Sequence, residues 1–130
     1  MKKMSLLLLL AVAAVAIVGL STDRATAVPA FNKQWTATHE KSPAIEAAKE
    51  AKCNLCHVPD EKKTVRNAYG ATLTKFVTKD DYNNLKGDPD ALKAKLEDAF
   101  KKAAAEKAPN GETWGKLFEA GKVPEPVKAP

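Results

Sequence analysis

The sequence predicts a small all-α domain of about four helices, and three observations lead to this fold class. Apolar residues recur at helical spacings of three and four, and no segment alternates as a half-buried strand does. Residues that favour the N-cap position precede four of the apolar stripes: Ser42, Asn67, Asp88 and Thr113. No internal repeat and no Gly/Ser-rich linker divides residues 28–130, which we therefore expect to form one domain.

The first 27 residues are expected to be a signal peptide. Lys2 and Lys3 precede an apolar run from residue 6 to residue 20, and Ala25-Thr26-Ala27 matches the small-x-small pattern that a signal peptidase accepts. The run is short for a permanent membrane span, and an uncleaved N-terminal anchor is the alternative. We expect cleavage after Ala27, export to the periplasm and no membrane attachment afterwards.

The charge of residues 28–130 argues against one class of partner. Removing Lys2, Lys3, Arg24 and Asp23 from 21 basic and 16 acidic residues leaves a net charge of +3, almost all of it from lysine. The ammonium group of lysine is a solvated point charge, whereas the planar guanidinium of arginine can bind a phosphate through two parallel hydrogen bonds. In addition, no basic run is interleaved with aromatic residues. Nucleic-acid binding is therefore not expected.

Two helices are expected before residue 60. The first spans residues 31–40 and places Phe31 and Trp35 on one face, because residues four apart are neighbours on a helix. The second follows Ser42 as N-cap, with a proline at the first helical position, and runs to about His57.

The second half of the chain predicts three further helical segments. Asn67 caps a segment with a stripe of apolar residues, and Asp88 caps the longest helix, which the Pro-Asn-Gly sequence at 109–111 stops. Residues 80–84 indicate a turn or a short helical break. Thr113 caps a short last helix that ends at Gly121, and the proline-rich tail 122–130 is expected to be extended. The two stripes are Tyr69, Leu73, Phe76 and Val77, then Leu92, Leu96, Ala99, Phe100 and Ala103.

Cys53, Cys56 and His57 form the motif C-x-x-C-H, which is typical of covalent haem c attachment. Two thiols three residues apart on a helical turn lie on one side and can bond the two vinyl groups of one haem. The adjacent imidazole can then bind the iron as the proximal ligand. The apolar stripes are narrow for a domain of this size, and a large apolar cofactor would complete the core. We therefore expect one covalent haem c, with the helices packed around it.

Three other interpretations of the cysteine pair compete with haem attachment. A structural disulfide or a thioredoxin-like redox pair would suit an oxidising compartment, but the redox pair needs a βαβ context that is not visible. A zinc site would need a fourth ligand from the other histidine or a carboxylate. None of the three explains the adjacent His57, the export signal and the small core together.

Several segments resemble the small monohaem cytochromes c of planctomycetes, which include pairs found in anaerobic ammonium-oxidising bacteria. The segments of this chain that carry the resemblance are Phe31 to Trp35, Ala51 to Val58, Arg66 to Gly70, Thr113 to Leu117 and Ala120 to Pro124. The resemblance spans nearly all of residues 28–130, but only the haem motif is chemically specific. It implies a periplasmic cytochrome c domain, and some relatives bind diatomic gases such as nitric oxide and work as heterodimers. The cysteine distal ligand of some relatives has no candidate here.

The sixth ligand of the iron is the open question of the sequence. Met1 and Met4 lie in the expected signal peptide, so the rest of the chain has no methionine for His/Met coordination. His39 is the one other histidine and the leading internal candidate as distal ligand, since lysine and tyrosine must first lose a proton. The alternatives are a lysine, a tyrosine, the new amino terminus, a partner chain or an open site. Because its neighbours are polar, His39 is alternatively expected to be a solvent-exposed residue at the end of a helix, with no role as a ligand.

Aromatic residues at helical spacing are expected to pack against the haem, Trp35 and Tyr69 among them. Arg66 is expected to cap a helix or to pair with a haem propionate. Since no further catalytic group accompanies the motif, we expect no enzyme activity. Electron transfer with a redox partner protein is the expected function, and a gas-binding haem module, as a heterodimer with a similar cytochrome, is the alternative.

Overall fold

The computed structural model describes residues 28–130, and this part of the chain contains helices but no strand. The expected signal peptide lies outside the described residues. The elements are α1 (Pro29–Thr38), α2 (Ile45–Ala51), the 3₁₀ helix η1 (Lys52–Leu55), α3 (Ala68–Leu73), α4 (Lys79–Leu85), α5 (Pro89–Ala105) and α6 (Trp114–Glu119). The prediction of an all-α fold is confirmed. None of the described helices is long and apolar enough to cross a membrane.

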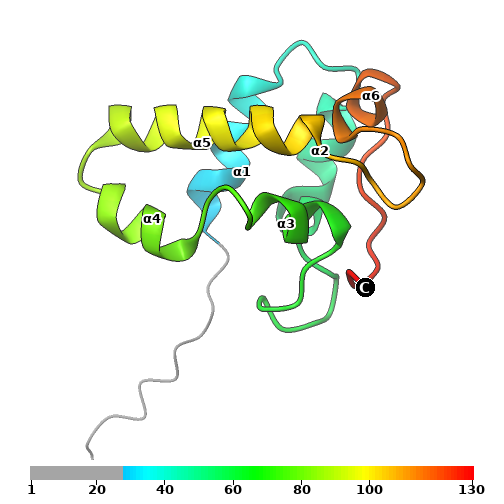
Figure 1. The fold of residues 1–130 in the computed structure, drawn as a ribbon, viewed down its shortest axis with the longest axis horizontal. Coiled ribbons are helices and arrows are strands. Elements are labelled where there is room, and N and C mark those ends of the chain that lie inside the picture. The colour runs from blue at the N-terminus through cyan, green and yellow to red at the C-terminus, as the bar shows by residue number, and fades with distance from the viewer. Residues whose placement is uncertain (1–27) are drawn as a thin grey trace, which may run out of the picture.

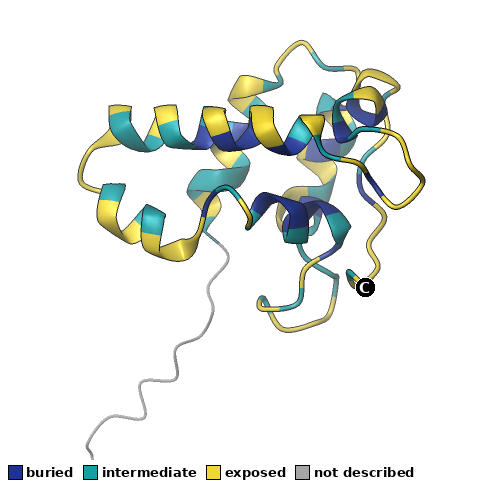
Figure 2. Cartoon of the chain, in the orientation of Figure 1, coloured by how far each residue is buried: buried dark blue, intermediate teal, exposed yellow. Residues whose placement is uncertain are grey.

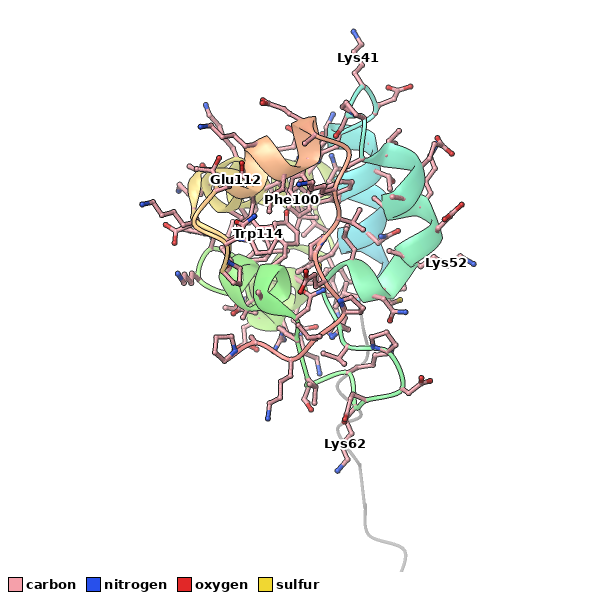
Figure 3. The ribbon with its side chains drawn as sticks, turned by 90° about the vertical axis from the view of Figure 1, so that its right-hand side faces the viewer. Lys41, Lys52, Lys62, Phe100, Glu112 and Trp114 are labelled. Atoms are coloured by element: carbon pink, nitrogen blue, oxygen red, sulfur yellow. The ribbon has the colours of Figure 1, made fainter. Side chains whose placement is uncertain are left out.

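The longest helix, α5, is the centre of the packing. It contacts α1, α3, α4 and α6, and Figure 1 shows it lying across the molecule with α3 and α4 along one side. Its expected stripe is buried at Leu96, Ala99, Phe100 and Ala103, and Figure 2 shows this buried face turned toward α3. Phe100 and Trp114 lie in the interior, whereas Lys41, Lys52 and Lys62 point outward (Figure 3).

Three of the four predicted caps are present. The side chains of Asn67, Asp88 and Thr113 accept hydrogen bonds from backbone N–H groups three residues further on, at the starts of α3, α5 and α6. Residues 80–84, expected to form a turn or a short helical break, instead belong to α4. Its start carries a reciprocal capping box between Thr78 and Asp81, which offsets the poor helix propensity of the acidic and amide residues.

The helix before the cysteine motif is shorter than predicted. Ser42 is not its cap, because α2 begins only at Ile45 with Ala44 as the N-cap residue. The Oγ of Ser42 instead accepts from the N–H of Ala44 and donates to the carbonyl of Phe118, each at 3.2 Å. The helix ends at Ala51, since Lys52 adopts a positive φ of 50°. The residues around Cys53 therefore form a tighter 3₁₀ turn, and the expected α-helix does not reach His57.

The tail after α6 crosses back over the middle of the chain. Residues 122–130, expected to be extended, contain no helix. The N–H of Ala129 donates to the carbonyl of Arg66 at 3.0 Å, and Pro124 is buried. The tail thus covers the segment that enters α3, although composition alone indicated a loosely held end.

Candidate functional site

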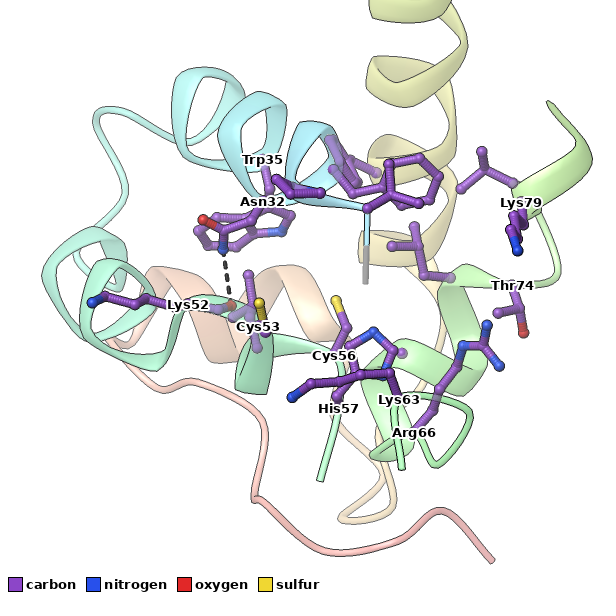
Figure 4. Close-up of a pocket in the computed structure, with 18 of the residues that line it drawn as sticks. Asn32, Trp35, Lys52, Cys53, Cys56, His57, Lys63, Arg66, Thr74 and Lys79 are labelled. Carbon is purple, nitrogen blue, oxygen red and sulfur yellow. Dashed lines mark hydrogen bonds between the residues drawn. The ribbon is translucent and has the colours of Figure 1, made fainter. Parts of the chain in front are cut away.

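The two cysteines and His57 line one open cleft of about 890 Å³. Figure 4 shows α1 along one side of this cleft and the turn that carries Cys53, Cys56 and His57 along the other. We call these sides the α1 wall and the floor. Apolar side chains supply much of the lining: Val28, Pro29, Phe31, Trp35, Leu55, Leu73, Val77 and Phe100. The motif and the ring of Trp35 thus face each other across a largely apolar space.

The side chains of Cys53 and Cys56 both line the cleft, and Figure 4 shows their sulfur atoms turned toward the α1 wall. Burial raises the pKa of the Cys56 thiol to about 12, although the positive charge of Arg66 acts in the opposite direction. At neutral pH this cysteine is a thiol rather than a thiolate. Low-pKa thiolates characterise reactive cysteines, so Cys56 is not itself an activated nucleophile.

His57 is held so that one ring nitrogen is free for a ligand. Its Nδ1 lies 3.3 Å from the carbonyl oxygen of Val65, which makes Nδ1 the protonated nitrogen and leaves the Nε2 lone pair unused. Burial lowers the pKa of His57, the charges of Arg66 and Lys63 lower it further, and the hydrogen bond to Val65 opposes them. A neutral imidazole with a fixed tautomer is the form that binds a metal ion.

Asn67 holds the floor in shape from below. Its side chain is fully buried, and its Nδ2 donates to the carbonyls of Asn54 and Leu55, each at 3.1 Å. Its Oδ1 accepts from the N–H of Gly70 at 2.9 Å, and its own N–H donates to the carbonyl of Cys56 at 3.1 Å. Asn67 was predicted only as a helix cap, but it also satisfies the carbonyls of the turn between the two cysteines.

Gly70 lets α3 approach the floor very closely. A Cβ atom at this position would lie only 2.0 Å from the carbonyl oxygen of Cys56. No other residue type fits without movement of one backbone away from the other. This close contact sets the distance between the backbone of the Cys56–His57 turn and helix α3.

Two hydrogen bonds tie the α1 wall to the residues around the floor, and a third, from the side-chain amide of Gln34 to the carboxylate of Glu97 (3.3 Å), ties it to α5. The indole Nε1 of Trp35, which is buried, donates to the hydroxyl of Tyr69 at 2.9 Å. The side-chain amide of Asn32 donates to the carbonyl of Lys52 at 3.0 Å, across the mouth of the cleft (Figure 4). This second bond joins the wall directly to the residue with the positive φ that precedes Cys53.

Two of the predicted site residues lie away from the cleft. Tyr69 is fully buried behind Trp35 and does not line the cleft, so it supports the indole ring and does not offer a packing surface of its own. His39 also lies outside the lining. Its ring stacks on Trp35 with centroids 4.1 Å apart, and its Nδ1 lies 2.9 Å from the carbonyl of Trp35. The structure therefore does not bring His39 to Cys53, Cys56 and His57, and its expected role as distal ligand gains no support.

The edge of the cleft away from Cys53 is polar and positively charged. Arg66, Thr74 and Lys79 gather there (Figure 4), and Lys63 lines the cleft on the side of His57. No aspartate or glutamate is among the residues that line the cleft in the described part of the chain. The cleft therefore combines an apolar interior with one cationic edge.

Sequence reasoning found Cys53, Cys56, His57 and Trp35 but missed Asn32, Gly70 and Lys79, which no local pattern distinguishes. In the comparisons, no protein-family model, no curated protein and no solved structure matched the chain. Among residues 28–130, no group of three or more His, Cys, Asp or Glu side chains is arranged to hold a metal ion.

Proposed function

We propose that this chain is an exported monohaem c-type cytochrome that transfers electrons in the periplasm. The observation that carries the proposal is the arrangement of Cys53, Cys56 and His57 on one floor of an apolar cleft, opposite Trp35. When bound, haem c supplies a one-electron iron centre. The protein contributes the attachment, the proximal ligand and the exclusion of water.

The residues of the cleft fit this cofactor chemically. The thiols of Cys53 and Cys56 would hold the haem by each adding across one vinyl group, with the sulfur on one vinyl carbon and a hydrogen on the other, an addition that needs no oxidant. The free Nε2 of His57 provides the proximal ligand.

The charged edge fits the acidic side of a haem. In haem the propionates lie on the half of the ring opposite the vinyl groups, so thioethers at the cysteines direct them toward the far edge. Arg66 and Lys79 line that edge, and Thr74 lies between them (Figure 4). Guanidinium and ammonium groups stabilise carboxylates there by charge-assisted hydrogen bonds.

Electron transfer is the primary proposal because it requires only a bound haem and a redox partner. One observation favours gas binding as the second candidate. His57 is the sole imidazole that lines the cleft among the described residues, and His39 lies elsewhere. An iron without a distal side chain would bind NO or CO, and a similar cytochrome could then serve as a second subunit.

The test is expression with the native leader in a bacterium that matures c-type cytochromes. We expect haem to stay with the polypeptide under denaturing, reducing conditions, and Cys53→Ser or Cys56→Ser to lose one thioether each. Asn54→Ala is the matched control between the two cysteines and should keep both bonds. Complete extraction of haem from wild type by acid–acetone would refute the proposal.

A further inference from the structure

The structure points to a specific occupant of the sixth iron position. We propose that the α-amino group of Val28, created by cleavage after Ala27, is the second axial ligand of the haem iron. This inference rests on the proposed function. It assigns the distal site to the new chain terminus rather than to a side chain.

The first step is the inventory of nitrogen ligands near the cleft. His57 is on the floor, and His39 is engaged with Trp35 outside the lining. The amines that line the cleft are Lys52, Lys63 and Lys79. In Figure 4 Lys52 points away from the cleft, Lys63 lies on the side of His57, and Lys79 lies at the cationic edge with Arg66.

The second step is the position of Val28. It lines the same cleft as Cys56 and His57, but it belongs to the α1 wall, the side opposite the floor. The N–H of Phe31 donates to the carbonyl of Val28 at 3.0 Å, which holds Val28 against the first turn of α1.

The third step is chemical. A ligand to iron must be unprotonated, and an α-amino group has an ordinary pKa of about 7.7–8.0, against about 10.4 for a lysine side chain. Roughly one terminus in ten is therefore already a free amine at pH 7. Cleavage after Ala27 turns the amide nitrogen of Val28 into such an amine at the wall of the cleft. Before cleavage the same nitrogen has no lone pair to offer.

The experiment uses the full holoprotein, purified after export with its own leader. We expect a mass that begins at Val28 with one haem, a low-spin ferric spectrum and slow or absent CO binding on reduction. Insertion of Gly-Ser between Ala27 and Val28 moves the amine along the chain and should give a high-spin ferric protein that binds CO. Val28→Ala keeps the amine and should stay low-spin.

Further variants separate the competing ligands. Lys79→Arg, which removes the lysine amine but keeps the positive charge at the cationic edge, and His39→Ala should both leave the low-spin spectrum unchanged. The near-infrared magnetic circular dichroism band should report a histidine–amine pair. The proposal is overturned by a high-spin wild type, by a mature chain that begins elsewhere, or by a low-spin spectrum that survives the insertion. A change to high spin in Lys79→Arg or His39→Ala also overturns it. Loss of covalent haem in wild type would instead refute the proposed function, which is a distinguishable result.

Discussion

Replacing Gly70 by alanine tests whether the close approach of α3 fixes the floor of the cleft. The new Cβ would lie 2.0 Å from the carbonyl oxygen of Cys56 and 2.9 Å from its carbonyl carbon. Overpacking of this kind costs about 1–3 kcal/mol. The displaced carbonyl also loses its hydrogen bond from Asn67, worth about 1 kcal/mol. Alanine regains about 1 kcal/mol of helix propensity. The net loss of unfolding free energy is about 1–3 kcal/mol.

Urea and thermal unfolding of the purified protein measure this loss. A domain of this size should melt roughly 5–20 °C lower. Gly87→Ala is the matched control, because its Cβ meets nothing within 4 Å, and it should be neutral or stabilised by about 0.4–1 kcal/mol. Gly115→Ala, with its Cβ 3.2 Å from the carbonyl of Ala104, should fall between the two. Equal stability of the Gly70 and Gly87 variants would refute the reasoning.

Three further predictions concern the supports of the cleft. Asn67→Ala should cost about 2–4 kcal/mol in urea unfolding, since it leaves two buried carbonyls without donors. Asn67→Asp keeps the helix cap but sets a carboxylate against those carbonyls, so it should be less stable at pH 7 than at pH 4. Trp35→Phe and Tyr69→Phe each break the same 2.9 Å bond and should each cost about 1–2 kcal/mol, with the double variant costing less than the sum. Burial lowers the pKa of His39, so the unfolded state binds more protons. Unfolding free energy should therefore fall as the pH drops below about 6.5, and His39→Gln should remove that part of the fall.

Each of these predictions has an outcome that contradicts it. Equal stability of Asn67→Asp at pH 7 and at pH 4 would show that the carbonyls of Asn54 and Leu55 are free to turn toward water. Additive losses at Trp35 and Tyr69 would mean that the two groups do not depend on one bond. A pH profile identical in wild type and His39→Gln would assign the acid sensitivity to other groups, His57 first among them.

The parts of the fold that could be predicted from the sequence are those determined by interactions within one helical turn. Asp88 followed by a proline marked the start of α5, since a cap and a preset φ act within one turn. The same local reasoning failed at α4, where Asp81 reads as a turn former until Thr78 is recognised as its capping partner. Composition could not reveal either the positive φ of Lys52 or the end of α2 before the cysteines.

The candidate site divides in the same way. Cys53, Cys56 and His57 were predicted because their chemistry lies in their spacing. His39 was the leading distal candidate because it was the one spare imidazole, but the direction of its ring depends on Trp35, with which it stacks. Such orientations are set by tertiary packing, and spacing along the chain does not contain them.

The hydrogen bonds that shape the floor have a consequence for the order of folding. Asn67 reaches back only 12 and 13 residues to Leu55 and Asn54, so this loop closes at little entropic cost. The bonds of the α1 wall join residues 20, 34 and 63 positions apart. The floor can therefore form first as a nearly autonomous loop, and the wall closes over it afterwards. Both thiols thus belong to a part of the chain whose contacts are local, whereas the wall that faces them depends on contacts between residues distant in sequence.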